Sequence, residues 1–139
     1  MRTVSSRSVR RVGAADVILV DSITQTEPGD AGHIVISGSH GGTSAAFFAA
    51  QVPARLYAFN DAGIGKDRAG IAGLDLLESH GIAAVAVSHD SAAIGDAADT
   101  LDNGVMTAAN GAARLLGAET GLALAVLVLA LAEATQPED

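Results

Sequence analysis

The chain has 139 residues, a formal net charge of −8 at pH 7 and no cysteine. Hydrophobic residues make up 49% and charged residues only 17%, which excludes an intrinsically disordered chain because such chains need the opposite balance. Without cysteine there are no disulfides, thiolate metal sites or cysteine nucleophile. Aromatic residues are 3% of the chain, too few for a platform that stacks bases or sugars.

Basic residues are concentrated at the N-terminus, where Arg2, Arg7, Arg10 and Arg11 account for half of the eight cations. From Val12 onward four cations face sixteen acids, so the body repels phosphate backbones and we expect no nucleic-acid partner. The basic segment lacks an apolar h-region, which argues against secretion and predicts a cytoplasmic protein. We interpret residues 1–12 as a flexible basic arm and residues 13–139 as a single α/β domain.

Four short apolar segments bounded by Gly, Pro, Asp or Ser predict strands. They are Val17–Val20, His33–Ile36, Arg55–Phe59 and Ala83–Val87. Helices are predicted after the last three strands, over Thr43–Val52, Asp67–His80 and, beyond a polar stretch at 88–104, Val105–Leu116. This alternation predicts a three-layer, Rossmann-like α/β domain with a mostly parallel sheet of about four strands and right-handed crossovers. Val17–Val20 would be an edge strand.

The segment Gly121–Ala132 is apolar throughout and lies between Glu119 and Glu133. Because a membrane span needs about 20 apolar residues, this shorter segment predicts a buried C-terminal helix and no membrane partner. An apolar helix without a polar face must be covered on all sides. We therefore expect the chain to form a homo-oligomer through this helix.

Polar, glycine-rich loops follow the three later strands, at residues 37–42, 60–67 and 88–96. In a parallel sheet these loops share the carboxyl edge, where ligands bind. The glycines would let backbone N–H groups converge on an anion, and Lys66 is the only lysine of the chain. The candidate substrate-binding residues are Ser39, Gly41, Gly42, Asn60, Gly63, Gly65, Lys66, Asp90, Ser91 and Asp96.

His40, Asp61 and His89 are the candidate catalytic residues. Imidazole groups titrate near neutrality, which suits general acid–base chemistry. Asp61 directly follows a predicted strand, where its carboxylate could act as a general base or a metal ligand, or simply cap an Asx turn. No residue is assigned to a metal, and the cofactor is left open, with a divalent ion held by His and Asp as a variant. Arg68 stands where the dinucleotide fingerprint needs its third glycine, which argues against NAD.

These features predict a small-molecule enzyme of the hydrolase, lyase or isomerase type that acts on a compact anionic metabolite at the carboxyl edge of the sheet. Two alternatives remain open. The same loops could hold an effector in a non-catalytic ligand-binding or regulatory subunit, or the chain could be an oligomeric structural protein.

Overall fold

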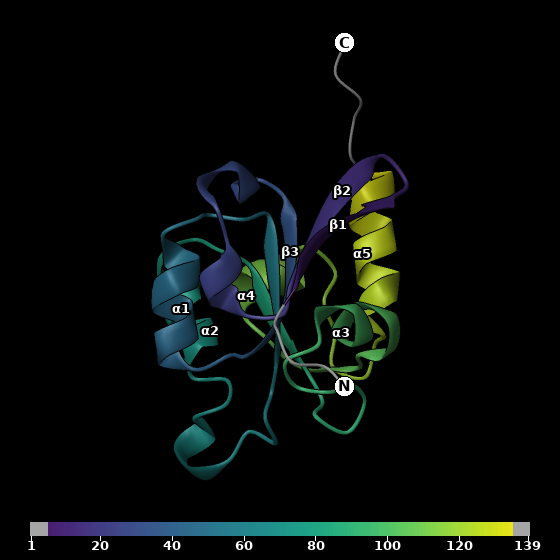
Figure 1. Ribbon diagram of the computed structural model, residues 1–139. Helices are drawn as coiled ribbons and strands as arrows, with labels where there is room; N and C mark the ends of the chain where they lie inside the picture. Colours follow the sequence, from purple (N-terminus) through teal and green to yellow (C-terminus); the bar gives the residue numbers. More distant parts are fainter. Residues whose placement is uncertain (1–5, 135–139) are drawn as a thin grey trace.

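Six strands form one sheet, and they lie side by side in the order in which they occur along the chain. Figure 1 shows this sheet between two groups of helices. The computed structural model describes residues 6–134. The strands are β1 (Arg7–Val12), β2 (Ala15–Val20), β3 (Ile34–His40), β4 (Leu56–Asn60), β5 (Ala84–Val87) and β6 (Met106–Ala109). The α-helices are α1 (Thr43–Ala50), α2 (Gly73–Ser79), α3 (Ala97–Asn103), α4 (Gly111–Leu115) and α5 (Leu124–Glu133), with 3₁₀ turns at η1 (Ile23–Gln25), η2 (Pro28–Asp30) and η3 (Lys66–Arg68).

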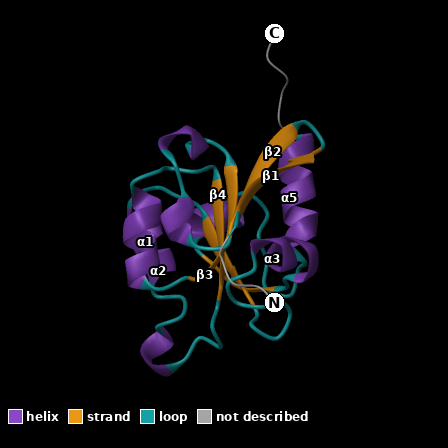
Figure 2. Ribbon diagram, viewed as in Figure 1, coloured by secondary structure: helices purple, strands orange, loops and turns teal. Residues whose placement is uncertain are grey.

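Helices cover both faces of the sheet, with α1 and α2 on one side and α3 and α5 on the other (Figure 2). The side chains of the central strands alternate between these two layers. In β4, Tyr57 and Phe59 pack toward α1 and α2, whereas Leu56 and Ala58 pack toward α3 and α5. All of these side chains are fully buried, which explains why this strand reads as one apolar run.

The α/β class is confirmed, but the prediction of about four strands is wrong. Strands β2 to β5 are parallel, while β1 and β6 pair antiparallel at the two edges. Strand β1 comes from the expected flexible arm, so Arg7–Val12 is a strand and Val17–Val20 lies inside the sheet. Its sequence RSVRRV is polar because an edge strand faces solvent, and Gly13 turns the chain at a φ of +56°. Residues 1–5 of that arm lie outside the described residues.

Two predicted helices differ from the structure. The first half of the predicted helix Val105–Leu116 is β6, and only Gly111–Leu115 is helical. The polar stretch at 88–104 contains α3, which begins where Asp96 caps the amide of Asp99. The helix predicted from Asp67 begins at Gly73, because Asp67 and Arg68 take left-handed backbone angles that end η3.

The chain leaves β4 and β5 toward opposite faces of the sheet. After β4 it continues into α2, and after β5 it continues into α3 across the sheet (Figure 1). Neighbouring strands whose connections diverge in this way leave a crevice at their carboxyl ends, which is where ligands bind in open α/β sheets. The fold thus favours a binding site at the carboxyl ends of β4 and β5. No helix within residues 6–134 is long and apolar enough to span a membrane.

Candidate active site at the carboxyl edge of the sheet

The three polar loops meet at one edge of the sheet, as the sequence predicts. The amide of Gly95 donates to the carbonyl of Gly38 at 2.7 Å, which joins the third loop to the first. The amide of Gly41 donates to the carbonyl of Asn60 at 3.1 Å, which joins the first loop to the second. Segments separated by up to 57 positions therefore form one continuous rim, because β3, β4 and β5 run parallel.

Asp61 lies at the centre of this rim and is only 4% exposed. Its Oδ1 accepts the amides of Gly63 (2.7 Å) and His89 (3.0 Å), and its Oδ2 accepts the hydroxyl of Thr107 (2.7 Å). Burial raises the pKa of Asp61, but the hydrogen bonds from Thr107, Gly63 and His89 outweigh burial and the net pKa is lowered. Asp61 is therefore an ionised carboxylate at neutral pH, held by three hydrogen bonds.

His89 stands beside this carboxylate with half of its side chain exposed. Its Nδ1 lies 3.5 Å from Oδ1 of Asp61, slightly longer than an ordinary hydrogen bond, and its Nε2 lies 3.3 Å from Oδ1 of Asp90. A β-carbon on Gly63 would lie 3.4 Å from Cε1 of His89, so the loop after β4 packs closely against the ring. The structure thus brings together two of the three predicted catalytic residues.

His40 occupies a separate part of the rim. Its Nδ1 accepts the amide of Gly42 at 3.1 Å, so a neutral ring carries its proton on Nε2. A β-carbon on Gly42 would come within 2.8 Å of the ring, which explains the glycine there. His40 lines an open cavity of about 240 Å³ with Ala62, Ile64, Gly65, Ala69 and Gly70. Among residues 6–134 no bond or ion pair joins its side chain to Asp61 or His89.

The loop after β4 differs from the expected anion-binding loop, because its amides are bonded within the chain. Ala62 donates to the side chain of Asn60 and Gly63 to that of Asp61, while the amides of Ile64 and Gly65 donate to backbone carbonyls. The loop is also strained. Ala62, Ile64, Asp67 and Arg68 all have φ values between +49° and +65°, a region that residues with a β-carbon rarely occupy. Such strain collects at functional sites in proteins.

Several other predicted ligand residues hold the loops together. Asn60 is fully buried and donates to the carbonyl of Ala92 at 3.0 Å. The hydroxyl of Ser39 accepts the amide of Ile23, that of Ser91 accepts the amide of Val105, and Asp96 caps α3. Gly41 packs against Leu74, where a β-carbon would lie 3.0 Å away. Lys66 and Asp90 are exposed at the rim.

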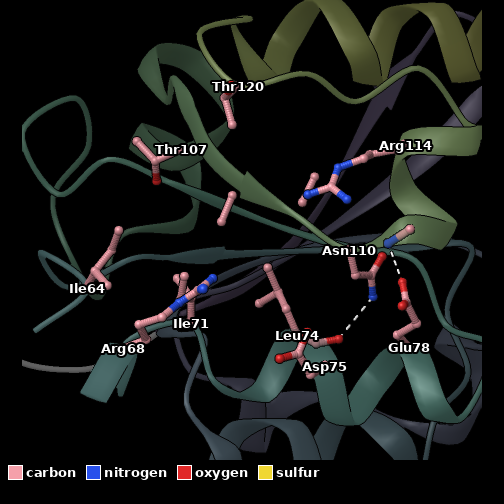
Figure 3. Close-up of a pocket in the computed structure, with 13 residues that line it drawn as sticks. Ile64, Arg68, Ile71, Leu74, Asp75, Glu78, Thr107, Asn110, Arg114 and Thr120 are labelled. Atoms are coloured by element: carbon pink, nitrogen blue, oxygen red, sulfur yellow. Dashed lines mark hydrogen bonds between the residues drawn. The ribbon is translucent and has the colours of Figure 1, made fainter. Parts of the chain in front are cut away.

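A larger cavity, of about 440 Å³, lies between α2 and β6 (Figure 3). Thr107, Arg68 and Arg114 line this cavity, and sequence analysis identified none of them as site residues. Thr107 lies in a segment that the sequence predicts as helical, and Arg114 is in a short helix far along the chain. No local pattern marks either residue, because only the antiparallel pairing of β6 with β5 places Thr107 near the carboxyl edge and Arg114 beyond the amino end of β5.

Within the part of the chain that the structure describes, no three His, Asp or Glu side chains are grouped so that they could hold a metal ion. Comparison of the chain with protein-family models, with curated proteins and with solved structures finds no match.

Proposed function

We propose that this chain is an enzyme that moves a proton on a small anionic metabolite at the carboxyl edge of its sheet. The observation that carries the proposal is the buried carboxylate of Asp61 beside the half-exposed imidazole of His89. A buried, ionised acceptor next to one ring nitrogen fixes the tautomer and orientation of the other, which is how carboxylates support histidine bases. Hydrolysis, lyase chemistry and isomerisation all use such a base.

The two residues have different roles in this proposal. A lowered pKa makes Asp61 a weak base, so Asp61 is a positioning residue that accepts a proton-bearing Nδ1. His89 then offers Nε2 to the substrate as the acid–base group. The exposed carboxylate of Asp90 must turn away from Nε2 when substrate binds, which its position on an exposed loop allows.

The test is to incubate the purified protein with a metabolite extract and to follow changes in composition by mass spectrometry. We expect compounds that change with the parent protein and change at least about a hundredfold more slowly with His89→Ala, the usual contribution of a general base. His80→Ala is the matched control because His80 lies at the exposed end of α2. If the parent changes no compound, or His89→Ala acts like the parent, the proposal is wrong.

A second candidate is a ligand-binding or regulatory subunit without turnover. It is favoured by the observation that neither Asp61 nor His89 lines the 440 Å³ cavity, whereas Thr107, which bonds to Asp61, does. Saturable binding of a metabolite without any product would support this reading over the enzyme.

A further inference from the structure

We infer that the 440 Å³ cavity between α2 and β6 is a binding site for a carboxylate or phosphate group, held between Arg68 and Arg114. This inference rests on the proposed function in one respect. It takes the anionic group to be part of the substrate of the Asp61–His89 pair, and it places that group in this cavity. Nothing in the sequence pattern pointed to this cavity. Its volume is in the range of small-molecule sites in proteins.

The first support is that both arginines lack a protein partner. Arg7, Arg10 and Arg11 each pair with a carboxylate, at 2.7, 2.6 and 3.1 Å. Arg68 and Arg114 form no ion pair or side-chain hydrogen bond within residues 6–134. Both side chains are exposed, so in a chain with twice as many acids as cations two guanidinium groups that line one cavity are free to bind an anionic ligand.

The second support is the direction of these side chains. Figure 3 shows Arg68 and Arg114 on different walls of the cavity, with both guanidinium groups directed into the space between them. Arg68 has a φ of +58°, a strained conformation of the kind that binding sites maintain. Ile71 and Leu74 lie between the two walls and are almost fully buried. An anion placed there would therefore meet two exposed, forked donors above a buried apolar floor.

Two carboxylates also line the cavity, and their partners decide whether an anion is tolerated. Glu78 is engaged by the amides of Gly111 and Ala112 at the start of α4, which offset its charge. Asp75 is exposed and has no side-chain partner within the described residues. Asp75 can accept a hydrogen bond from a hydroxyl or amino group. The lining thus suits a hydroxy acid, an amino acid or a phosphorylated alcohol better than a bare polyanion.

Thr107 connects this cavity to the Asp61–His89 pair. Its hydroxyl donates its only proton to Asp61 at 2.7 Å, so its oxygen presents lone pairs on the cavity side. Within residues 6–134, Thr107 is the one residue lining the cavity that is hydrogen-bonded to the buried carboxylate. A ligand anchored by the arginines would therefore extend past Thr107 toward the proposed acid–base group.

The test is calorimetric titration of the full chain with malate and, separately, with glycerol phosphate, which distinguish carboxylate from phosphate recognition. Succinamide, which is neutral, is the control ligand. We expect at least one anionic probe to bind. Arg68→Gln and Arg114→Gln should each raise its dissociation constant about tenfold or more, because each removes a charge-assisted hydrogen bond. Arg11→Gln carries the same charge change on an exposed hairpin pair and should stay within about twofold of the parent.

The outcomes separate this inference from the proposed function. His89→Ala should bind the anionic probe as the parent does, so loss of turnover with retained binding supports both. Arginine-dependent binding without His89-dependent turnover would support the anion site and contradict the proposed enzymatic function. If neither probe binds the parent, if succinamide binds equally well, or if both arginine variants bind like the parent, the anion site is wrong.

Discussion

The carboxylate of Asp30 accepts both terminal nitrogens of Arg7, at 2.7 and 2.8 Å, across 23 positions of the chain. Asp30 is 2% exposed and also accepts the amide of Glu27 at 2.8 Å. The bidentate pair joins the edge strand β1 to η2, which lies in the connection between β2 and β3. An arginine that the sequence assigns to a flexible arm thus neutralises a buried acid of the body.

We expect Arg7→Gln to lower the free energy of unfolding by about 2–3 kcal/mol, between the values for exposed and fully buried ion pairs. The cost arises because the buried carboxylate of Asp30 loses its charged partner. Arg11→Gln, which breaks the exposed pair with Asp16, should cost less than about 1 kcal/mol. Urea unfolding of the two variants measures the difference. Equal effects would mean that the Arg7–Asp30 pair adds nothing beyond a surface contact.

Stability should fall in acid because of Asp30 and Asp61. The hydrogen bond from Arg7 holds the pKa of Asp30 below its usual value, and hydrogen bonds do the same for Asp61 against its burial. Groups whose folded-state pKa is lowered contribute stability above the unfolded-state pKa of about 4, and lose it as pH falls through the folded-state pKa. We expect the contribution of both carboxylates to be constant from about pH 7 to 5 and to decline below about pH 4.

Thr107→Val isolates the Asp61 part of this effect. The variant removes one hydrogen bond to the carboxylate, so the pKa of Asp61 should rise toward its ordinary value and stability at pH 7 should fall by about 1–2 kcal/mol. Carbon-13 titration of the aspartate carboxyl groups measures the pKa directly. An unchanged pKa of Asp61 in this variant would show that the Thr107 bond does not form in solution.

The loop after β4 depends on Gly70, where a β-carbon would lie 2.0 Å from the carbonyl oxygen of Asp61. No rotamer change relieves a clash between two backbone segments, so Gly70→Ala should destabilise the protein by more than about 3 kcal/mol or prevent folding. Gly29→Ala is the matched control, since nothing lies within 4 Å and its φ is not positive. Thermal unfolding and soluble yield compare the two. A Gly70→Ala protein as stable as Gly29→Ala would contradict this loop conformation.

How much of the fold the sequence predicts depends on where each strand lies. The helix over Thr43–Val52 and the strands of the centre are found nearly where expected, because buried strands are continuous apolar runs. The two edge strands are missed. Arg7–Val12 is half arginine and lacks a regular apolar alternation, and Met106–Ala109 is too short and alanine-rich to be distinguished from a helix.

The candidate site shows the same division. Asp61 and His89 could be predicted to meet because they are the first and second residues after two neighbouring parallel strands, β4 and β5. The partner that holds the outer oxygen of Asp61 could not, because Thr107 reaches it only through an antiparallel pairing across 46 positions. Likewise, a glycine-rich loop predicts freely available amides, yet in residues 62–65 the side chains of Asn60 and Asp61 take up two of them. Loop composition does not reveal such internal partners.

Helix α5 allows the expected self-association to be tested without disturbing the core. Leu124, Leu127, Val128 and Leu131 are buried, so removing the helix would unfold the protein, but Val126 and Leu129 are 54% and 47% exposed. We expect the parent to be an oligomer in light scattering and the double variant Val126→Glu, Leu129→Lys to be a monomer with an unchanged circular dichroism spectrum, because the new charges would be buried in a contact through this face. Phe47→Glu, at an exposed position of α1, should keep the parent's size. A monomeric parent, or an oligomer that survives the double substitution, would show that this face of α5 lies in no contact between copies.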